Sequence, residues 1–352
     1  MPPHTDPAPE PRQRKWRQAP FKEHLRKFST YFQPFDWHHA VVCVPGLAAC
    51  LLYGLITHDT LTAAMAAGAS FSVGFGLRRF HQTRSMLGAA ALMTAAALIG
   101  SLTAGHFFLY LPLVTLAAAG CACLALIDED IWWVCLQATI ALLLASHYAG
   151  DLDAALHRAG IVALAGAFQM LCVLALDRLI PRGHPKAPRN TPIPATRRTL
   201  TVYGLVAGAS VCLGMLAAYG LHLDKAYWAP MTALIVLKPK YQLTKQRGFE
   251  RLIGNVAGCA IATGLTFVLP ALGWLDLVLC VLGAGCAYAL TKARYAAFSL
   301  AVSFTAVMLL YVAHTSALHG AEQRVYATVL GGLIAIAVMW TASKTLARDF
   351  AI

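Results

Sequence analysis

The stretch AYWAPMTALIVLKPKYQLTKQRGFERLIGNVAG, residues 226–258, joins a short apolar run to a Lys-Pro-Lys break and a small-residue helix. The apolar run from Ala226 to Leu237 is 12 residues long, about 18 Å of helix, too short to cross a bilayer core of roughly 30 Å alone. Pro239 lacks an amide hydrogen and disfavours helix at Lys238. The stretch therefore predicts a broken helix in a membrane protein, with its cations at or just inside one membrane boundary.

The composition of the whole chain supports a membrane setting. Of its 352 residues, 58% are hydrophobic and 12% charged, and the mean hydropathy of +0.60 excludes a soluble surface. The apolar runs are continuous and rich in Ala, Leu and Gly, which favours helices over the alternating strands of a barrel. We expect an all-α, polytopic membrane protein with about 12 transmembrane helices. Their predicted centres are Ala49, Ala69, Ala96, Ala117, Leu142, Ala167, Val211, Ala233, Ala262, Gly283, Thr305 and Ile334.

The distribution of charge predicts the orientation. Lys and Arg favour the cytoplasmic side of short loops. With the N-terminus inside, all of the 28 basic residues except Arg158, Lys225 and Arg324 fall on the cytoplasmic side. The first 36 residues are basic and lack an apolar core, so we expect a cytoplasmic tail and no cleavable signal. The net charge of +12 is then a product of topology and anionic lipid contact, and no nucleic-acid-binding element is recognisable.

An internal repeat divides the chain into two halves. Shifting the sequence by 166 residues aligns Met65 with Met231, Gly88 with Gly254, and Arg158 with Arg324, together with the hydropathy profiles. Six helices per half predict two parallel six-helix repeats. The expected parts are a basic tail (1–36), the first repeat (37–180), a Pro/Arg-rich cytoplasmic linker (181–198) and the second repeat (199–352).

A basic strip follows the predicted break. If helix resumes near Lys240, then Lys240, Thr244, Arg247 and Arg251 lie on one face, and Gly254 and Gly258 continue that face into the membrane. Such a strip could line a path for an anion, since Arg offers a fork for a carboxylate. The alternative is flanking charge that only sets topology, followed by a small-residue packing face.

The same stretch resembles a known family. Tyr227, Trp228, Pro239, Arg251, Gly254 and Gly258 match the signature of the fusaric acid resistance protein-like integral membrane transporters, which include aromatic acid exporters. Asn255 stands where the pattern has Thr, and the surroundings of Pro239 are unusually basic. The resemblance implies proton-driven export of organic, often aromatic, carboxylic acids through the bacterial inner membrane.

These observations define the expected site. Lys238, Lys240, Arg247 and Arg251 would attract the anion and Tyr227 and Trp228 would shape the path, while Pro239, Gly254 and Gly258 are structural. The alternatives are a passive anion channel or a non-transporting, membrane-organising protein. No enzyme constellation, metal site or cofactor motif is recognisable. The expected partners are membrane lipids and a small organic anion, with a homo-oligomer as a further expectation.

Two questions about other side chains stay open at the level of sequence. The acidic cluster Asp128 to Asp130 could pair with Lys292 and Arg294 of the other half, and no acid lies near the centre of a span. Tyr227 and Trp228 could belong to an aromatic belt at the membrane interface instead of the path.

Overall fold

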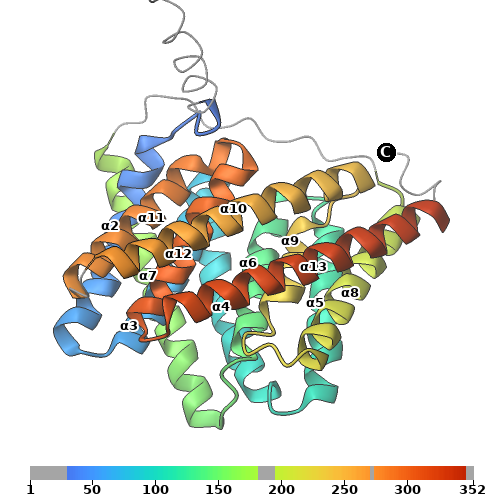
Figure 1. The fold of residues 1–352 in the computed structure, drawn as a ribbon, viewed down its shortest axis with the longest axis horizontal. Coiled ribbons are helices and arrows are strands. Elements are labelled where there is room, and N and C mark those ends of the chain that lie inside the picture. Colours follow the sequence, from blue (N-terminus) through green and yellow to red (C-terminus); the bar gives the residue numbers. More distant parts are fainter. Residues whose placement is uncertain (1–29, 181–194, 270–272, 346–352) are drawn as a thin grey trace, which may run out of the picture.

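The computed structural model describes residues 30–180, 195–269 and 273–345, and these form helices joined by short connections (Figure 1). Within these ranges the α-helices are α2 (Trp37–Thr57), α3 (Thr60–Gly74), α4 (Gln82–Thr103), α5 (Phe107–Leu124), α6 (Glu129–Ala145), α7 (Leu152–Leu179), α8 (Arg197–Gly220), α9 (Trp228–Val236), α10 (Tyr241–Val268), α11 (Gly273–Ala289), α12 (Tyr295–Val312) and α13 (Ala317–Thr345). Short 3-10 turns follow α3 (Phe75–Arg78) and α11 (Leu290–Lys292). Most of the predicted tail and linker lies outside the described residues.

The predicted all-α, polytopic membrane fold is confirmed. Each of the twelve predicted centres falls in a separate helix, and ten of the described helical segments are long and apolar enough to cross a membrane. The expectation of about twelve full spans needs correction at two helices. The 17 residues of α6 and the 9 residues of α9 correspond to about 26 Å and 14 Å, both shorter than the hydrocarbon core.

Polar caps mark where several helices begin. Asp59, Asp128 and Asp151 precede α3, α6 and α7, and each accepts hydrogen bonds from backbone N–H groups of the first turn. These N–H groups have no partner within the helix, so a capping carboxylate accepts hydrogen bonds from them. Its negative charge also interacts favourably with the positive end of the helix dipole. The chain therefore turns at positions where the sequence supplies short acidic residues.

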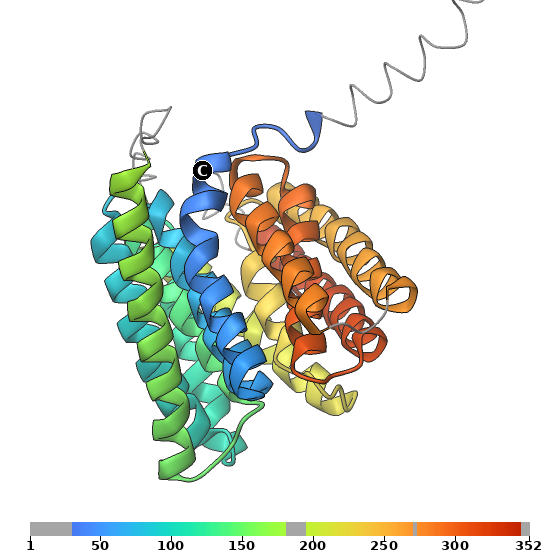
Figure 2. The same ribbon diagram turned by 90° about the vertical axis from the view of Figure 1, so that its left-hand side faces the viewer.

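The two halves of the chain lie on two sides of the molecule (Figure 2). In the first half α2 contacts α3, and α4 contacts both α6 and α7; in the second half α8 contacts α9, and α10 contacts both α12 and α13. Between the halves, α5 contacts α8 and α11 contacts α2. Each contact within the first half is thus repeated within the second half by the helices six places later in the chain. The contact between α5 and α8 is likewise matched by the one between α11 and α2. The two parallel six-helix repeats stay a prediction, which these recurring pairs favour.

The outer surface is apolar and the interfaces between helices are made of small residues. Leu116, Leu164, Leu205 and Leu333 are among many large apolar side chains that face outward. In water such a surface would be unfavourable, and in a bilayer it contacts lipid tails. Ala and Gly dominate the buried positions, which allows helix backbones to approach closely.

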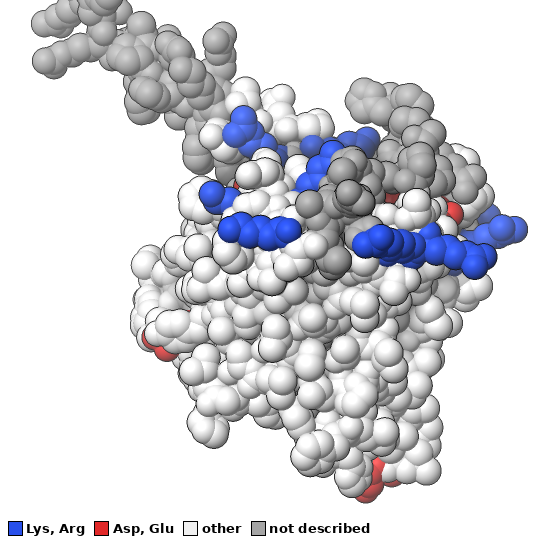
Figure 3. Space-filling model, turned by 90° about the vertical axis from the view of Figure 1, so that its right-hand side faces the viewer, with Lys and Arg blue, Asp and Glu red and all other residues white. Residues whose placement is uncertain are grey.

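Charge is distributed unevenly along the bundle. The basic end, as we call it, carries Arg78, Arg79, Lys238, Lys240 and Arg294, where α3, α9 and α11 finish and α4, α10 and α12 begin. On the face drawn in Figure 3, Lys and Arg gather near this end, and only acidic charges appear at the other.

Candidate anion-binding site

The site begins at the predicted break between α9 and α10. Leu237 has extended backbone after the nine residues of α9, and α10 starts at Tyr241 with Lys240 in the N-cap position. The Thr244 hydroxyl closes the turn, because it accepts a hydrogen bond from the Lys238 N–H at 2.9 Å and donates one to the Lys238 carbonyl at 3.0 Å. The broken helix is thus present at the residues where the sequence predicts it.

Lys238 is held against the other half of the molecule at the basic end. Its Nζ lies 5.4 Å from the ring centre of Trp132, at the start of α6, a cation–π distance. Burial, and secondly the nearby charge of Arg247, lowers the pKa of the Lys238 ammonium group to about 8. Lys240 is exposed. The two lysines of the Lys-Pro-Lys sequence therefore have different surroundings, one half-buried and one in solvent.

The basic strip runs along α10 from solvent into the bundle. Lys240 is exposed, Arg247 is half-buried and Arg251 is buried. Tyr295, the first residue of α12, joins the two arginines: the guanidinium carbon of Arg247 lies 3.5 Å from its ring centre, and Arg251 Nη1 donates a hydrogen bond to its hydroxyl at 3.0 Å. The structure therefore brings Arg247 and Arg251 together and adds Tyr295, which the sequence interpretation did not include.

Beyond Arg251, the strip ends in a helix-packing layer. A Cβ at Gly254 or Gly258 would overlap the backbone of α12, so these glycines serve close contact between α10 and α12. Asn255 donates a hydrogen bond to Thr328 of α13 and accepts one from Ser303 of α12. Asn255, which departs from the family pattern, thus links three helices. The alternative in which Gly254 and Gly258 form a helix-packing face describes this part of α10 well.

A second buried arginine reaches the same region from α13. The sequence interpretation counted Arg324 among outer loop charges, which is wrong, because α13 begins at Ala317 and places Arg324 inside the helix, about 10 Å from its start. Its guanidinium carbon lies 5.1 Å from the ring centre of Trp228. The one sequence signal was its alignment with Arg158 in the repeat.

These arginines lack carboxylate partners. Arg251 and Arg324 are each only 6% exposed, and the Nε atoms of Arg247, Arg251 and Arg324 are buried without a hydrogen-bond partner in the described part of the chain. No ion pair joins any of the three to a described acid. Positive charge without local compensation is costly inside a membrane. The arrangement is suited to an anion that supplies the missing charge.

The predicted aromatic pair lies deeper than the lysines. Tyr227 and Trp228 stand at the start of α9, at the opposite end of that helix from Lys238. They are 3% and 6% exposed, so an aromatic belt facing the membrane interface is the wrong interpretation. Trp228 contacts Arg324, whereas Tyr227 packs on His147, which itself contacts Lys225 at 3.3 Å. The predicted site therefore divides into a level at the basic end and a deeper level.

The acidic cluster before α6 contacts the connection between α3 and α4. Glu129 pairs with Arg79 at 2.9 Å, and Asp130 accepts hydrogen bonds from the backbone N–H groups of Phe80 and His81. These contacts tie the connection between α3 and α4 to the start of α6. For Arg294, one of the partners expected in the other half, the observed contact is the ring of Tyr31 at 4.1 Å.

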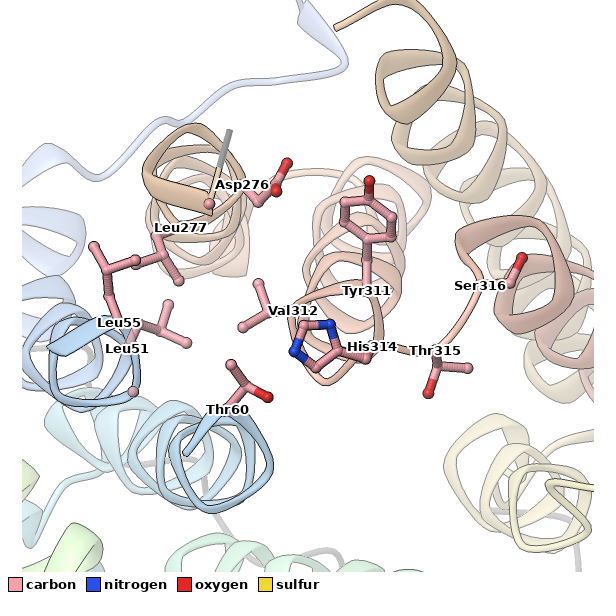
Figure 4. A pocket seen from close by; sticks show the side chains of 12 residues that line it. Leu51, Leu55, Thr60, Asp276, Leu277, Tyr311, Val312, His314, Thr315 and Ser316 are labelled. Atoms are coloured by element: carbon pink, nitrogen blue, oxygen red, sulfur yellow. The ribbon is translucent and has the colours of Figure 1, made fainter. Parts of the chain in front are cut away.

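A separate pocket of about 630 Å³ opens at the other end of the bundle, between α2, α3, α11 and α12 (Figure 4). Tyr311 and His314 project into it, and Asp276 lies on its rim. Its lining includes Asp276 but no Lys or Arg, and none of the predicted site residues. An organic anion would meet no fixed positive charge there, so this pocket is a poor candidate for the anion site.

The part of the chain that holds the candidate site is similar to a known protein family. Residues 211–338 match the family model described as fusaric acid resistance protein-like. This segment is similar to that family. The resemblance drawn from residues 226–258 is thereby confirmed, and the fusaric acid resistance protein-like segment contains Trp228, Arg251, Tyr295 and Arg324. This match and the many apolar helices are those of a multi-pass membrane protein.

A curated relative matches this chain over a segment of similar length to the family match. The uncharacterized protein YhfK of Escherichia coli (strain K12) is 33% identical over 129 residues, which are 36% of this chain and 18% of that protein. The chain thus spans less than a fifth of the length of this relative. No solved structure shows a significant match.

Proposed function

We propose that this protein is a secondary transporter of the bacterial inner membrane that exports organic, including aromatic, carboxylic acids by means of the proton gradient. The observation that carries the proposal is the basic strip of α10, which leads from exposed Lys240 through half-buried Arg247 to buried Arg251 without a carboxylate partner in the described chain. The match of residues 211–338 to the fusaric acid resistance protein-like family supports the transporter class.

The direction of entry follows from the orientation. The positive-inside rule assigns the basic end to the cytoplasm, which puts both termini of the chain there. A cytoplasmic organic acid would then meet Lys238 and Lys240 first, because exposed and half-buried cations raise the local concentration of anions. Arg247 and Arg251 would receive its carboxylate further in, where fewer water molecules compete.

Coupling to protons is implied by the family resemblance. In the described spans, the charged groups of the strip are cations with no acid among their ion-pair partners, so a carboxylate relay beside the strip is not part of the proposal. Membrane lipids and the organic anion are the proposed partners, and a homo-oligomer remains compatible with the apolar outer surface.

The proposal is tested by efflux of labelled benzoate from cells that express the protein, with and without an uncoupler. We expect efflux above the empty-vector control that falls when the uncoupler collapses the proton gradient. Efflux that is insensitive to the uncoupler would indicate the alternative of a passive anion channel. Absence of flux for benzoate and for a panel of other labelled organic acids would contradict transport and favour a membrane-organising role.

A further inference from the structure

We propose that His147 and Lys225 form the site at which the driving proton binds from the outer compartment, and that the bound proton opens a contact between the two halves of the chain. This inference rests on the proposed function and adds to it the group that couples export to protons. It starts from the contact of Lys225 Nζ with His147 Nε2 at 3.3 Å. Coupling of this kind needs no acid inside a span, because an imidazole titrates near neutral pH.

The contact lies at the end of the bundle opposite the basic end. His147 follows α6, which begins at Glu129 beside Arg79, and Lys225 precedes α9, which ends next to Lys238. The positive-inside rule therefore assigns His147 and Lys225 to the outer side. His147 belongs to the first half of the chain and is exposed, whereas Lys225 belongs to the second half and is 8% exposed. The pair thus joins the halves at a place where outer protons reach the imidazole.

The charge of Lys225 is directed at His147. Its neighbour Asp224 pairs with His319 of α13 at 2.8 Å, and no ion pair joins Lys225 to an acid of the described chain. An ammonium group has only donors, so His147 Nε2 accepts, and the imidazole is neutral with its own hydrogen on Nδ1. Burial lowers the pKa of Lys225, and desolvation, followed by the charge of Lys225, lowers the pKa of His147. The contact therefore holds while the pair carries one positive charge.

The other titratable groups around His147 come from several elements. They are Tyr148 beside it, Asp224 and Tyr227 on the connection that carries Lys225, Tyr110 of α5, Arg158 of α7 and His319 of α13. Asp224 favours a proton on His147 but is shared with His319. Tyrosine side chains are neutral over the pH range in which imidazole titrates. Lys225 is the charge in direct contact with the imidazole, and it is the one that a proton on His147 opposes.

A proton on His147 turns the contact from attraction to repulsion. Nε2 then bears a hydrogen and can no longer accept one, and two positive charges at 3.3 Å repel each other. Separation of the two side chains loosens the halves at the outer end, where an exported acid must leave. Uptake of a proton from outside is thereby joined to opening on the same side.

Aromatic rings connect this pair to the deeper level of the candidate site. The ring centre of Tyr227 lies 5.8 Å from that of His147 and 5.5 Å from that of Trp228, whose ring in turn lies 5.1 Å from the Arg324 guanidinium carbon. Lys225, Tyr227 and Trp228 belong to one short stretch of chain at the start of α9. Movement of Lys225 away from the imidazole therefore moves the rings that support Arg324.

The first test measures the protonation of His147 in the purified full-length protein in lipid nanodiscs. The C2 hydrogen of an imidazole exchanges with deuterium at a rate that depends on protonation, so mass spectrometry over a range of pH gives a midpoint for each histidine. Lys225→Gln should raise the proton affinity of His147 about tenfold, because it removes the positive charge beside the ring. Lys225→Arg retains the charge and should keep the wild-type midpoint. Exposed His157 of α7, at the same end, is the internal control and should have one midpoint in all three proteins.

The second test is efflux of labelled benzoate from cells, compared at equal amounts of protein in the membrane. In His147→Gln the side-chain oxygen still accepts from Lys225 but takes up no proton, so efflux should fall about tenfold or more and lose its response to the uncoupler. His147 is exposed, so this variant should keep the wild-type midpoint of thermal unfolding. His157→Gln is the matched control and should export as the wild type does.

The outcomes separate this inference from the proposed function. Uncoupler-sensitive efflux at the normal rate after His147→Gln would refute the site and leave proton-driven export standing, as would a His147 midpoint that Lys225→Gln does not move. A midpoint that moves as expected, in a protein whose wild type shows no uncoupler-sensitive efflux, would refute proton-driven export and leave the proton-binding contact standing.

Discussion

At the scale of single residues, position along α10 decides what a positive charge does. Lys245 lies on the exposed face of the same helix, where a lysine costs little and is easily replaced. Arg251 is buried six residues further on and hydrogen-bonds Tyr295 across to α12. Two basic residues in one short segment thus have separate roles, and the difference can be measured.

Arg251→Ala should reduce the initial rate of efflux at least tenfold, whereas Lys245→Ala should leave it within about twofold of the wild type. The physical reason is that only Arg251 offers a desolvated donor to the anion. Efflux rates would be compared at equal amounts of protein in the membrane. Equal and negligible effects of both changes would show that the strip serves topology alone.

Lys238 makes the entrance sensitive to pH. Its pKa is lowered to about 8 by burial, so its positive charge is present below pH 8 and is lost as the pH rises through that value. Benzoate flux into vesicles with equal pH on both sides should therefore fall between about pH 7 and 9.

Lys238→Arg retains its charge over this range and should flatten the profile, while Lys240→Arg at the exposed neighbour should not. An unchanged fall with pH in the Lys238→Arg protein would assign the titration to another group.

At the scale of elements, the pairing of α10 with α12 positions the site. The contact depends on glycines, because Gly254 and Gly258 let the backbone of α12 approach and bring Tyr295 and Ser299 to Arg251. The end of α9 at Val236 has a similar effect, since it stops an apolar helix within the bundle and turns Lys238 toward α6. Local chain geometry thus sets which polar groups meet.

Gly254→Ala should destabilise the protein by about 1–3 kcal/mol, because the added methyl group overlaps the α12 backbone. Thermal unfolding in detergent would show a lower midpoint. Gly264→Ala on the same helix is the control, since a Cβ there meets nothing within 4 Å. A midpoint as high as that of the wild type for Gly254→Ala would mean that the two helices are not in close contact.

At the scale of the whole molecule, the uneven distribution of charge specifies how the bundle sits in a membrane. The basic end gathers the connections after α3, α9 and α11, and the acidic caps Asp59 and Asp151 lie at the opposite end. The orientation matters for function, because it decides which compartment the exposed end of the basic strip faces.

Fusions to alkaline phosphatase, which is active only outside the cytoplasm, test the orientation. A fusion after Gly105, between α4 and α5, should be active, and one after Ile127, between α5 and α6, should be inactive. The reverse pattern would place the strip outside and make it a receiver of external anions.

The sequence by itself determined the features that depend on short stretches of chain. Continuous apolar runs predicted the membrane setting and the order of the helices, and Pro239 after a short apolar run predicted the break between α9 and α10. It could not foresee that Arg324 enters the bundle, because hydropathy alone placed this residue before the last span.

Only the tertiary structure decided which side chains meet. Arg251 and Tyr295 are 44 residues apart, and Arg324 of α13 lies against Trp228 of α9, so both contacts depend on how α9, α10, α12 and α13 pack. The same packing separates Trp228 from Lys238, although the two are close in sequence, because a helix carries its first and last residues to different depths. Hydropathy and helix breaks are read along the chain, whereas an anion site needs charges brought together across it.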